Sequence, residues 1–434
     1  MLQLDLRLSQ ISIFSLFGAL TLLTALVSLL AGFYPSLYLS SFNPVEVLKG
    51  KLRSGASGRW LRNILVIFQF TIGIFILLCT FLISNQLTYI QNKKLGYDKE
   101  NLIVIERTLP IKNKIEIFMD DLHNNPAIES VTLADAVPGR IYGNSAIMVE
   151  GLPTSDTKLF TFLSADYEYE KTMGIKMVDG RYFSKDFATD SSAIIINETG
   201  AKIIGLKNPV GRRLMIPISQ TAVKYCTIIG IMKDFNFESL HTPINPIIIT
   251  LVQSTFDGYV TVRTHKGKTK EALDYLNSTW KKYTNDAPLT YFFFDQEFEQ
   301  MYKTEYQTRK VMSVFTFFAI ITSCLGLLGL IAFTSERRTK EIGVRKAIGS
   351  STFNLILVLS SESVKLVLIS SLIASGLAYF AISRWLRNFA FHMDISWVVF
   401  VVAIVLALLI ALVTVIFVTI RAARKNPVEA LRFE

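Results

Sequence analysis

The sequence predicts a membrane all-α helical bundle of five transmembrane helices with an inserted α+β extracytoplasmic domain. Three observations support this prediction. The mean hydropathy of the 434-residue chain is +0.39, which is high for a soluble protein. The apolar residues gather in five long uncharged runs. The long segment between the second and third runs is polar and neutral overall, with 27 basic and 27 acidic residues between Ser84 and Lys310.

Each uncharged run predicts a membrane-spanning helix. At about 1.5 Å per residue, roughly 20 residues cross a hydrocarbon core of roughly 30 Å, and a helix satisfies its own backbone hydrogen bonds there. Buried core helices in a soluble protein are the alternative, but five such runs in one chain are rare in soluble cores. The predicted spans are Ile11–Phe33, Ile64–Ile83, Val311–Ser335, Leu366–Ser383 and Trp397–Ile420.

Basic residues next to the spans predict the orientation of the chain. Residues 43–63 carry a net charge of +4, residues 335–352 carry +3, and the tail after Ile420 carries +2. Because loops rich in Lys and Arg stay on the cytoplasmic side, we expect residues 85–310 on the outer side. The pI of 9.3 also fits a nucleic-acid-binding protein. We exclude nucleic acid as a partner, since the positive charge flanks membrane spans.

Hydrophobic patterning predicts two lobes in the outer domain. Each end of the segment has the pattern strand, helix, strand, so the two ends together predict one α+β subdomain, and the middle predicts an inserted second lobe. The elements at the two ends are Leu102–Glu106, Lys112–Asn124, Ser130–Ala134, Tyr259–Arg263, Lys270–Tyr283 and Leu289–Phe294. The predicted strands of the second lobe are Ala193–Asn197, Cys226–Ile231 and Ile247–Leu251.

Two polar stretches without Gly or Pro are predicted to extend the spans into the outer domain. Residues 296–310 continue into the span that begins at Val311, which predicts a single rigid helix. Residues 85–94 extend the second span until Gly96 ends it.

A short repeat predicts where the units of the chain end. The segment Asn43-Pro-Val-Glu-Val-Leu-Lys49 is echoed by Asn426-Pro-Val-Glu-Ala-Leu-Arg432, and each copy follows a span. Asn as N-cap, Pro at N1 and Glu at N3 favour the start of a cytoplasmic helix. The predicted cap residues are Asn43, Pro44, Glu46, Asn426, Pro427 and Glu429. The predicted units are the last span of a truncated first unit (1–50), a transmembrane helix (58–84), the outer domain (85–310) and a three-span segment (311–434).

The basic loop after the third span is the best candidate for a functional contact. Glu341 and Arg345 form an i,i+4 pair, and Gly349 suits a helix end. The alternative is an ordinary stop-transfer loop that lies on the anionic headgroups of membrane lipid. The candidate residues are Glu336, Arg337, Arg338, Glu341, Ile342, Gly343, Arg345, Lys346 and Gly349.

No catalytic, cofactor or metal site is predicted. The chain has no Walker A sequence, so it cannot hold nucleotide phosphates in a P-loop. Four histidines lack metal-ligand spacing and are expected to have surface or packing roles: His123, His241, His265 and His392. Inside the spans, Gln69 is expected to form a helix–helix hydrogen bond, and Gly326 and Gly329 are expected to allow close helix packing.

Four segments together resemble the MacB/FtsX-type ABC transporter permeases. They are ERRTKEIGVRKAIGS (336–350), RKNPVEALR (424–432), YEYEKTMGIKMVDGRYFS (167–184) and IIGIMKDFNFESLHTPINP (228–246). The resemblance covers essentially the whole chain. It implies an FtsX-like permease segment at 311–434 and a MacB-like periplasmic domain at 85–310, in a multi-pass protein of the cell inner (cytoplasmic) membrane.

The resemblance also implies partners and a function. In this family a cytoplasmic ABC ATPase subunit hydrolyses ATP, and a second permease unit completes a homodimer or heterodimer, so the chain itself is not expected to be an enzyme. The loop at 336–350 resembles the element that contacts the ATPase. Movement of the periplasmic domain then exports or extracts a lipoprotein, peptide or amphiphilic drug, with a periplasmic adaptor and an outer-membrane channel as further partners. The alternative is a transmembrane signalling coupler that regulates a cell-wall hydrolase or sensor kinase.

Overall fold

The chain divides into two compact units, Met1–Leu65 and Val66–Glu434. The computed structural model describes residues 13–40, 56–140, 143–151, 153, 157–217, 222–252, 258–284, 286–337 and 352–423. The first unit contains α1 (Ile13–Ser40) and the beginning of α3 (Ala56–Asn92). The second unit contains the rest of α3 and all later elements.

Among the described residues, four helices are long and apolar enough to cross a membrane. They are the stretches Trp60–Asn92 of α3, Lys303–Thr334 of α9 (Lys303–Arg337), Ser360–Leu386 of α11 (Thr352–Leu386) and Trp397–Phe417 of α12 (Trp397–Ala423). These stretches match the last four predicted spans. The first predicted span is not among them, because the apolar stretch described in α1 is the shorter Phe17–Leu29. The predicted count of five transmembrane helices is therefore not confirmed.

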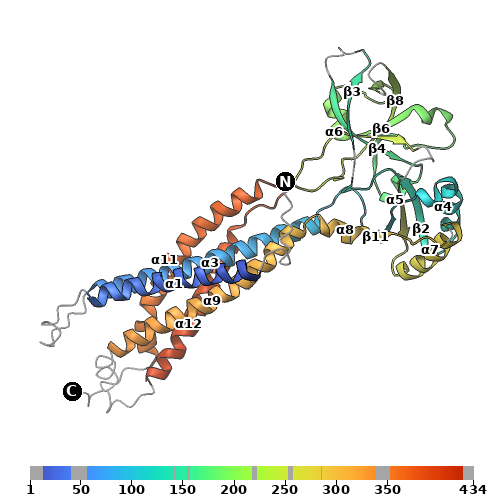
Figure 1. Ribbon diagram of the computed structural model, residues 1–434. Coiled ribbons are helices and arrows are strands. Elements are labelled where there is room, and N and C mark those ends of the chain that lie inside the picture. The colour runs from blue at the N-terminus through green and yellow to red at the C-terminus, as the bar shows by residue number, and fades with distance from the viewer. Residues whose placement is uncertain are drawn as a thin grey trace, which may run out of the picture. The chain divides into compact units, whose positions relative to one another are not determined.

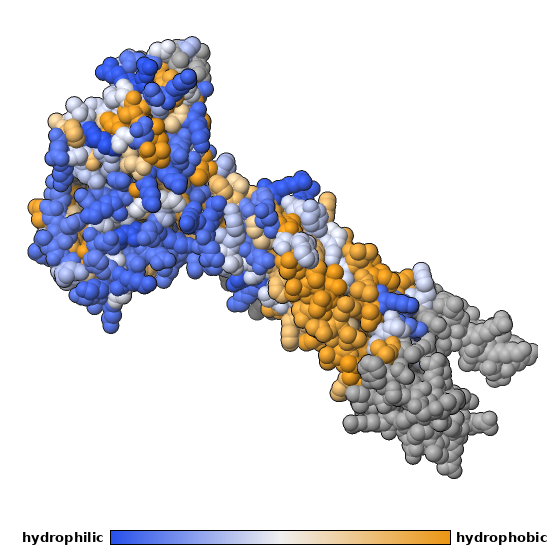
Figure 2. Space-filling view, turned by 180° about the vertical axis from the view of Figure 1, so that it is seen from behind, coloured by the Kyte–Doolittle hydropathy of each residue, from blue (hydrophilic) through white to orange (hydrophobic). Residues whose placement is uncertain are grey.

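Small residues let α11 and α12 pack closely. Ala374 and Ala378 of α11 are buried, as are Ala403, Ala407 and Ala411, which recur every four residues on one face of α12. Many large side chains of both helices are exposed instead, and Figure 2 shows hydrophobic residues gathered on the visible surface of the helical part. Such an apolar exterior fits a hydrocarbon surrounding.

A polar contact joins α3 to α9 within the apolar helices. Gln69 Nε2 donates a hydrogen bond to the Thr322 carbonyl oxygen at 2.5 Å, which confirms the expected helix–helix bond. A Cβ atom at Gly326 would lie 2.2 Å from Gln69 Oε1, so Gly326 makes room for this side chain. Nothing lies within 4 Å of the Cβ position at Gly329, so the close packing expected there is not found.

We expect Gly326→Ala to destabilise the bundle, because the new methyl group displaces Gln69 from its bond to Thr322. Hydrogen bonds between transmembrane helices contribute about 0.6 kcal/mol on average and up to about 1.7 kcal/mol. The free energy of unfolding, measured by steric trapping in bicelles, should fall by about 1 kcal/mol. Gly329→Ala is the matched control and should keep or slightly raise stability, because Ala favours a helix over Gly. Equal losses in the two variants would contradict this role of Gly326.

The first lobe of the outer domain is an antiparallel sheet with helices on one face. Its strands lie in the order β11 (Tyr291–Phe293), β1 (Leu102–Ile105), β10 (Tyr259–Thr264) and β2 (Ile128–Ala134). Helices α4 (Ile115–His123) and α7 (Thr269–Thr284) cover this sheet (Figure 1). Their rings Phe118 and Trp280 meet in the core with centroids 5.8 Å apart. The predicted strand–helix–strand units thus meet in one sheet, although η2 (Leu109–Lys114), a 3-10 helix, delays the start of α4.

The second lobe is a closed ring of six strands. Backbone pairing runs in the order β4, β3, β7, β8, β6, β9 and returns from β9 to β4. The ring encloses a buried apolar cluster that includes Phe160, Ile194 and Ile228. Gly200 of α6 lies against this cluster, because a Cβ atom there would be 2.7 Å from the Phe160 ring. The elements of this lobe are β3 (Asn144–Val149), β4 (Lys158–Ala165), β5 (Met177–Gly180), η3 (Ala188–Ser192), β6 (Ala193–Asn197), α6 (Glu198–Ile204), β7 (Arg213–Pro217), β8 (Val223–Met232) and β9 (Ile247–Leu251). Helix α5 (Tyr169–Met173), although it follows β4 in the chain, packs against β2 and β10 of the first lobe.

The predicted single helix over residues 296–310 is wrong. Helix α8 (Phe294–Gln300) ends before α9 begins, and Met301 and Tyr302 form a turn between them. Tyr302 is buried, and its hydroxyl accepts a hydrogen bond from the Leu240 backbone N–H at 2.9 Å. Tertiary contacts therefore interrupt a stretch that contains no helix-breaking residue. The predicted extension of the second span is confirmed, since α3 continues to Asn92 and Gly96 adopts φ +88° beyond it.

Candidate functional site

The residues predicted to contact an ATPase lie mostly outside the described part of the chain. Glu336 and Arg337 are the last two residues of α9. The remaining members of that predicted site lie outside the described residues: Arg338, Glu341, Ile342, Gly343, Arg345, Lys346 and Gly349. The predicted helix caps Asn43, Pro44, Glu46, Asn426, Pro427 and Glu429 lie outside them too. Within the described residues, the best candidate site is a junction near the other end of α9.

The loop between β8 and β9, residues 233–246, forms the core of this site and is named the junction loop. It is fixed at Asp234, whose carboxylate accepts hydrogen bonds from the Asn197 side chain and from the backbone N–H and hydroxyl of Thr199, at 2.8 to 2.9 Å. Asn197 is also the N-cap of α6, since its side chain accepts a hydrogen bond from the Gly200 N–H at 2.9 Å. The start of α6 and the start of the junction loop therefore hold each other in place.

The middle of the junction loop packs on the segment that follows α3. The Asn236 N–H donates to the Leu95 carbonyl oxygen at 2.7 Å. A Cβ atom at Gly96 would lie 2.7 Å from the Phe235 Cα atom and from the Asp234 carbonyl oxygen. Together with the positive φ, this contact requires glycine at position 96. The junction loop thus lies directly against the end of a membrane helix.

The tip of the junction loop reaches the connection between α11 and α12. The His241 carbonyl oxygen accepts a hydrogen bond from the Ala390 N–H, and the Leu240 carbonyl oxygen accepts one from the Phe391 N–H, at 3.2 Å each. The His241 ring stacks on the Phe389 ring with centroids 4.1 Å apart. Two membrane helices are therefore tied to the outer domain at this point.

Gln86 holds the same connection from α3. Its fully buried side chain donates through Nε2 to the Phe391 carbonyl oxygen at 3.1 Å and accepts through Oε1 from the Met393 N–H at 2.9 Å. Lys93 Nζ lies 4.3 Å from the centre of the Phe391 ring, which is a cation–π contact. The hydrogen bond from the Leu240 N–H to the Tyr302 hydroxyl brings in the residue just before α9. Four segments therefore meet at the junction: the junction loop, α3, the α11–α12 connection and the start of α9.

A histidine–carboxylate contact and a buried hydroxyl lie within the junction. His241 Nε2 lies 3.2 Å from Glu305 Oε1, and His241 Nδ1 lies 2.7 Å from Ser239 Oγ. Burial raises the pKa of Tyr302, so its hydroxyl stays neutral. No group of three or more His, Cys, Asp or Glu side chains in the described parts of the chain could hold a metal ion. What the junction offers is a mechanical connection.

One continuous hydrophobic core runs from the helices through the junction into the outer domain. It contains Leu78 and Val415 of the helices, Phe237 and Phe298 of the junction, and Ile195 of the strand ring. Packed protein interiors have low compressibility and transmit strain. The helices and the outer domain are therefore packed together through one shared core.

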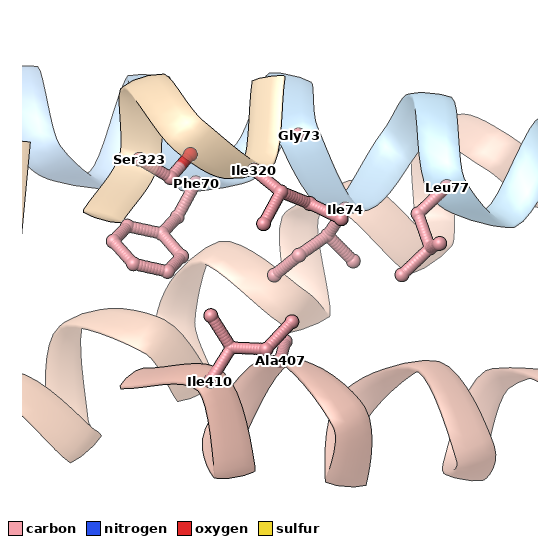
Figure 3. Close-up of a pocket in the computed structure, with 8 residues that line it drawn as sticks. All are labelled: Phe70, Gly73, Ile74, Leu77, Ile320, Ser323, Ala407 and Ile410. Atoms are coloured by element: carbon pink, nitrogen blue, oxygen red, sulfur yellow. The ribbon is translucent and has the colours of Figure 1, made fainter. Parts of the chain in front are cut away.

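A small apolar cavity lies between α3, α9 and α12 (Figure 3). It is lined by Phe70, Gly73, Ile74, Leu77, Ile320, Ser323, Ala407 and Ile410, and its volume is about 320 Å³ including space open to the surroundings. The one hydroxyl in the lining, on Ser323, donates to the Gln69 carbonyl oxygen at 3.4 Å. The cavity therefore offers van der Waals contact to apolar groups.

Sequence reasoning did not identify the junction as a site. The packing role expected for His241 is confirmed by its stack on Phe389. A signal existed in residues 234–241, where aromatic residues alternate with polar ones in a loop, because such apolar side chains need a buried partner. Their partners lie far away in the chain, at Leu95, Tyr302 and Phe389, so only the fold could identify them.

Comparisons with known protein families match most of the chain. Residues 64–275 match the MacB-like periplasmic core domain, and residues 313–427 match the FtsX-like permease C-terminal domain. The macrolide export ATP-binding/permease protein MacB of Neisseria gonorrhoeae is 22% identical over 326 residues, covering 70% of this chain and 49% of MacB. The chain thus spans about half the length of this relative. The ABC transporter permease YknZ of Bacillus subtilis is 24% identical over 286 residues, covering 61% of this chain and 68% of YknZ.

Solved structures of two relatives cover the outer domain. The periplasmic region of MacB from Actinobacillus actinomycetemcomitans aligns with a TM-score of 0.35 at 16% identity, over 48% of this chain and 94% of that one. The extracellular domain of YknZ aligns with a TM-score of 0.32 at 15% identity, over 44% and 98%. The two family matches lie in the same order along the chain as the outer domain and the last three membrane-capable helices. The chain therefore belongs to the MacB/FtsX-type ABC transporter permeases.

Proposed function

We propose that this chain couples ATP hydrolysis by a separate cytoplasmic ABC ATPase to movement of its periplasmic domain. The observation that carries the proposal is the junction, where α3, α9 and the α11–α12 connection meet the junction loop within one continuous core. The four uncharged runs in α3, α9, α11 and α12 lack the ionisable residues that mark ion or substrate pathways through membranes. This favours transmission of motion over conduction of a substrate.

The proposal includes a location, partners and a class of cargo. The chain resides in the inner membrane with residues 85–310 in the periplasm, pairs with a second permease unit, and contacts the ATPase through residues 336–350. Basic loops near the spans support this orientation. The cargo is a lipoprotein, peptide or amphiphilic drug, which is supported by relatives named for export.

A reducible bridge between α3 and α9 tests the proposal. Gln91 Nε2 donates to the Tyr306 hydroxyl at 2.6 Å, so these two side chains meet between the helices. Cysteines are placed at both positions after Cys79, Cys226 and Cys324 are replaced by Ala, and a short thiol-specific reagent joins them. The permease is co-purified with its ATPase in nanodiscs. We expect the ATP-dependent change in hydrogen exchange of the outer domain to disappear while ATP hydrolysis continues, and reduction to restore it.

The control joins two cysteines within α3, at Thr88 and Gln91, where no relative movement is needed. This bridge should leave the ATP-dependent change intact. A complete α3–α9 bridge with an unchanged exchange response would contradict transmission through these helices.

Co-purification distinguishes export from signalling. A cell-wall hydrolase or sensor kinase that is bound to the outer domain, without export, would favour the signalling coupler.

A further inference from the structure

The two lobes of the outer domain are joined at a narrow crossing of strands. Strand β2 of the sheet pairs with β4 of the ring through a single residue pair, Ala134 and Ala165. On either side of that pair, the Asp135 N–H donates to the Ser164 carbonyl oxygen at 2.9 Å, and the Asp166 N–H donates to the Leu133 carbonyl oxygen at 3.0 Å. This lobe crossing is therefore short, and each paired alanine is followed by an aspartate.

The carboxylate of Asp166 completes the crossing. Its Oδ2 atom accepts from the Leu133 N–H at 2.8 Å, and its Oδ1 atom accepts from the Glu168 N–H at 3.1 Å and from the Thr132 hydroxyl. The Asp135 carboxylate acts in the same way on the other side, accepting a hydrogen bond from a backbone N–H of β4 at 2.8 Å. Each carboxylate occupies the place that a backbone carbonyl would take in a longer ladder.

The surroundings of both carboxylates disfavour charge. Burial raises the pKa of Asp166 to about 6, and the hydrogen bonds it accepts offset only part of this effect. Burial also raises the pKa of Asp135. The charge of Glu168 raises the pKa of Asp166 further. Two buried phenols, Tyr169 and Tyr182, face the same carboxylates, and burial keeps both hydroxyls neutral.

Two cations of neighbouring segments, Arg263 and Lys185, have other partners. Arg263 of β10 donates to the Thr172 carbonyl oxygen and pairs with the Asp98 carboxylate. Lys185 lies over the Tyr167 ring at 5.8 Å. The charged residues within α5 are Glu170, which raises the pKa of Tyr182, and Lys171, which is exposed. Among the described residues neither carboxylate forms a salt bridge, so no cation offsets the effect of burial on the pKa of Asp166 or Asp135.

We infer that the lobe crossing is a pH-sensitive hinge, which holds the two lobes together more firmly in mild acid than at neutral pH, with Asp166 as the principal group and Asp135 as the second. A closed crossing buries the carboxyl group, and an open crossing hydrates it, so closure takes up a proton. The stabilisation of the closed crossing by protonated Asp166 is fully present below the ordinary aspartate pKa of about 3.9. It is lost as the pH rises through about 6. The inference does not depend on the proposed function.

Hydrogen exchange of the full chain in nanodiscs tests the hinge. Peptides covering β2 and β4 are followed at pH 5 and pH 7, with exchange times corrected for the intrinsic pH dependence of the amide reaction. We expect about tenfold more protection at pH 5 than at pH 7 in these strands. Asp166→Asn should abolish the difference. The control Asp121→Asn, at an exposed ion pair with Lys282, should retain it.

A second variant keeps the test valid if Asp166→Asn does not fold. The Thr132 hydroxyl donates a hydrogen bond to the Asp166 carboxylate and thereby favours the charged form of Asp166. Thr132→Val removes this hydroxyl. The pH at which protection is half lost should therefore rise in this variant. Equal protection of the wild-type strands at both pH values, or a midpoint that does not rise in Thr132→Val, overturns the inference.

Discussion

Replacing Arg263 with Met is expected to lower the free energy of unfolding of the outer domain by roughly 1 to 3 kcal/mol, because the buried Thr172 carbonyl oxygen loses its hydrogen-bond donor. Arg263 is 7% exposed and donates four hydrogen bonds. Nε reaches the Thr172 carbonyl oxygen at the end of α5, while the two terminal nitrogens reach Asp98 and the Glu100 carbonyl oxygen. The variant leaves these acceptors without their donor. The segment that follows α3, at Asp98 and Glu100, then loses its connection to α5 through Arg263.

Thermal or urea unfolding of the full chain in detergent, followed by near-UV circular dichroism, measures this loss. Lys282→Met is the control, because it removes a cation from an ion pair with Asp121 that is 67% exposed on the lysine side. Exposed pairs of this kind contribute little to stability, so the control should unfold like the wild type. If the two variants lost stability equally, Arg263 would not be the tie between α5 and the end of α3.

Gln86→Leu should loosen the hold of α3 on the α11–α12 connection and so weaken the transmission of motion to the outer domain. Leu is similar in size and apolar, but it can neither donate to the Phe391 carbonyl oxygen nor accept from the Met393 N–H. Two buried backbone groups then lack partners, which costs roughly 1 to 3 kcal/mol each. In the complex with the ATPase, we expect the ATP-dependent change in hydrogen exchange of the outer domain to fall to a small fraction of the wild-type response. ATP hydrolysis should continue.

Gln91→Leu is the matched control for this prediction. It makes the same substitution on the same helix, at an exposed position whose side chain reaches only the Tyr306 hydroxyl in its described hydrogen bond. Its exchange response should resemble that of the wild type. A full response in Gln86→Leu would show that the α11–α12 connection is not needed for transmission.

Much of the architecture follows from local sequence patterns. Uncharged runs predicted the four helices that the structure shows as long and apolar enough to span a membrane, and strand–helix–strand patterns predicted β1, β2 and β10 close to their observed bounds. Strands β3, β4, β5 and β7 were missed. β7 begins with Arg213 and ends with Pro217, and β5 is largely exposed, so neither shows clear apolar alternation. Their strand conformation comes from pairing with β8 and β3, which local patterns do not encode.

Local sequence patterns also could not predict the contacts of the junction. The sequence of residues 228–246 contributed to a family resemblance, but it did not indicate that Leu240 bonds Tyr302 or that His241 stacks on Phe389. The break between α8 and α9 was also hidden, because residues 296–310 favour a helix throughout. A buried tyrosine with a tertiary hydrogen bond outweighed that local preference at Tyr302.

By itself, the sequence determined that this chain has long apolar helices, a neutral outer domain and basic flanks, because charge and hydropathy act over a few residues at a time. Only the tertiary structure decided that six strands close into a ring, that a single residue pair joins this ring to the sheet, and that Gln86 holds the α11–α12 connection. Those features depend on pairings between residues far apart in the chain. Such pairings form only when the whole domain excludes water and buried polar groups must find partners.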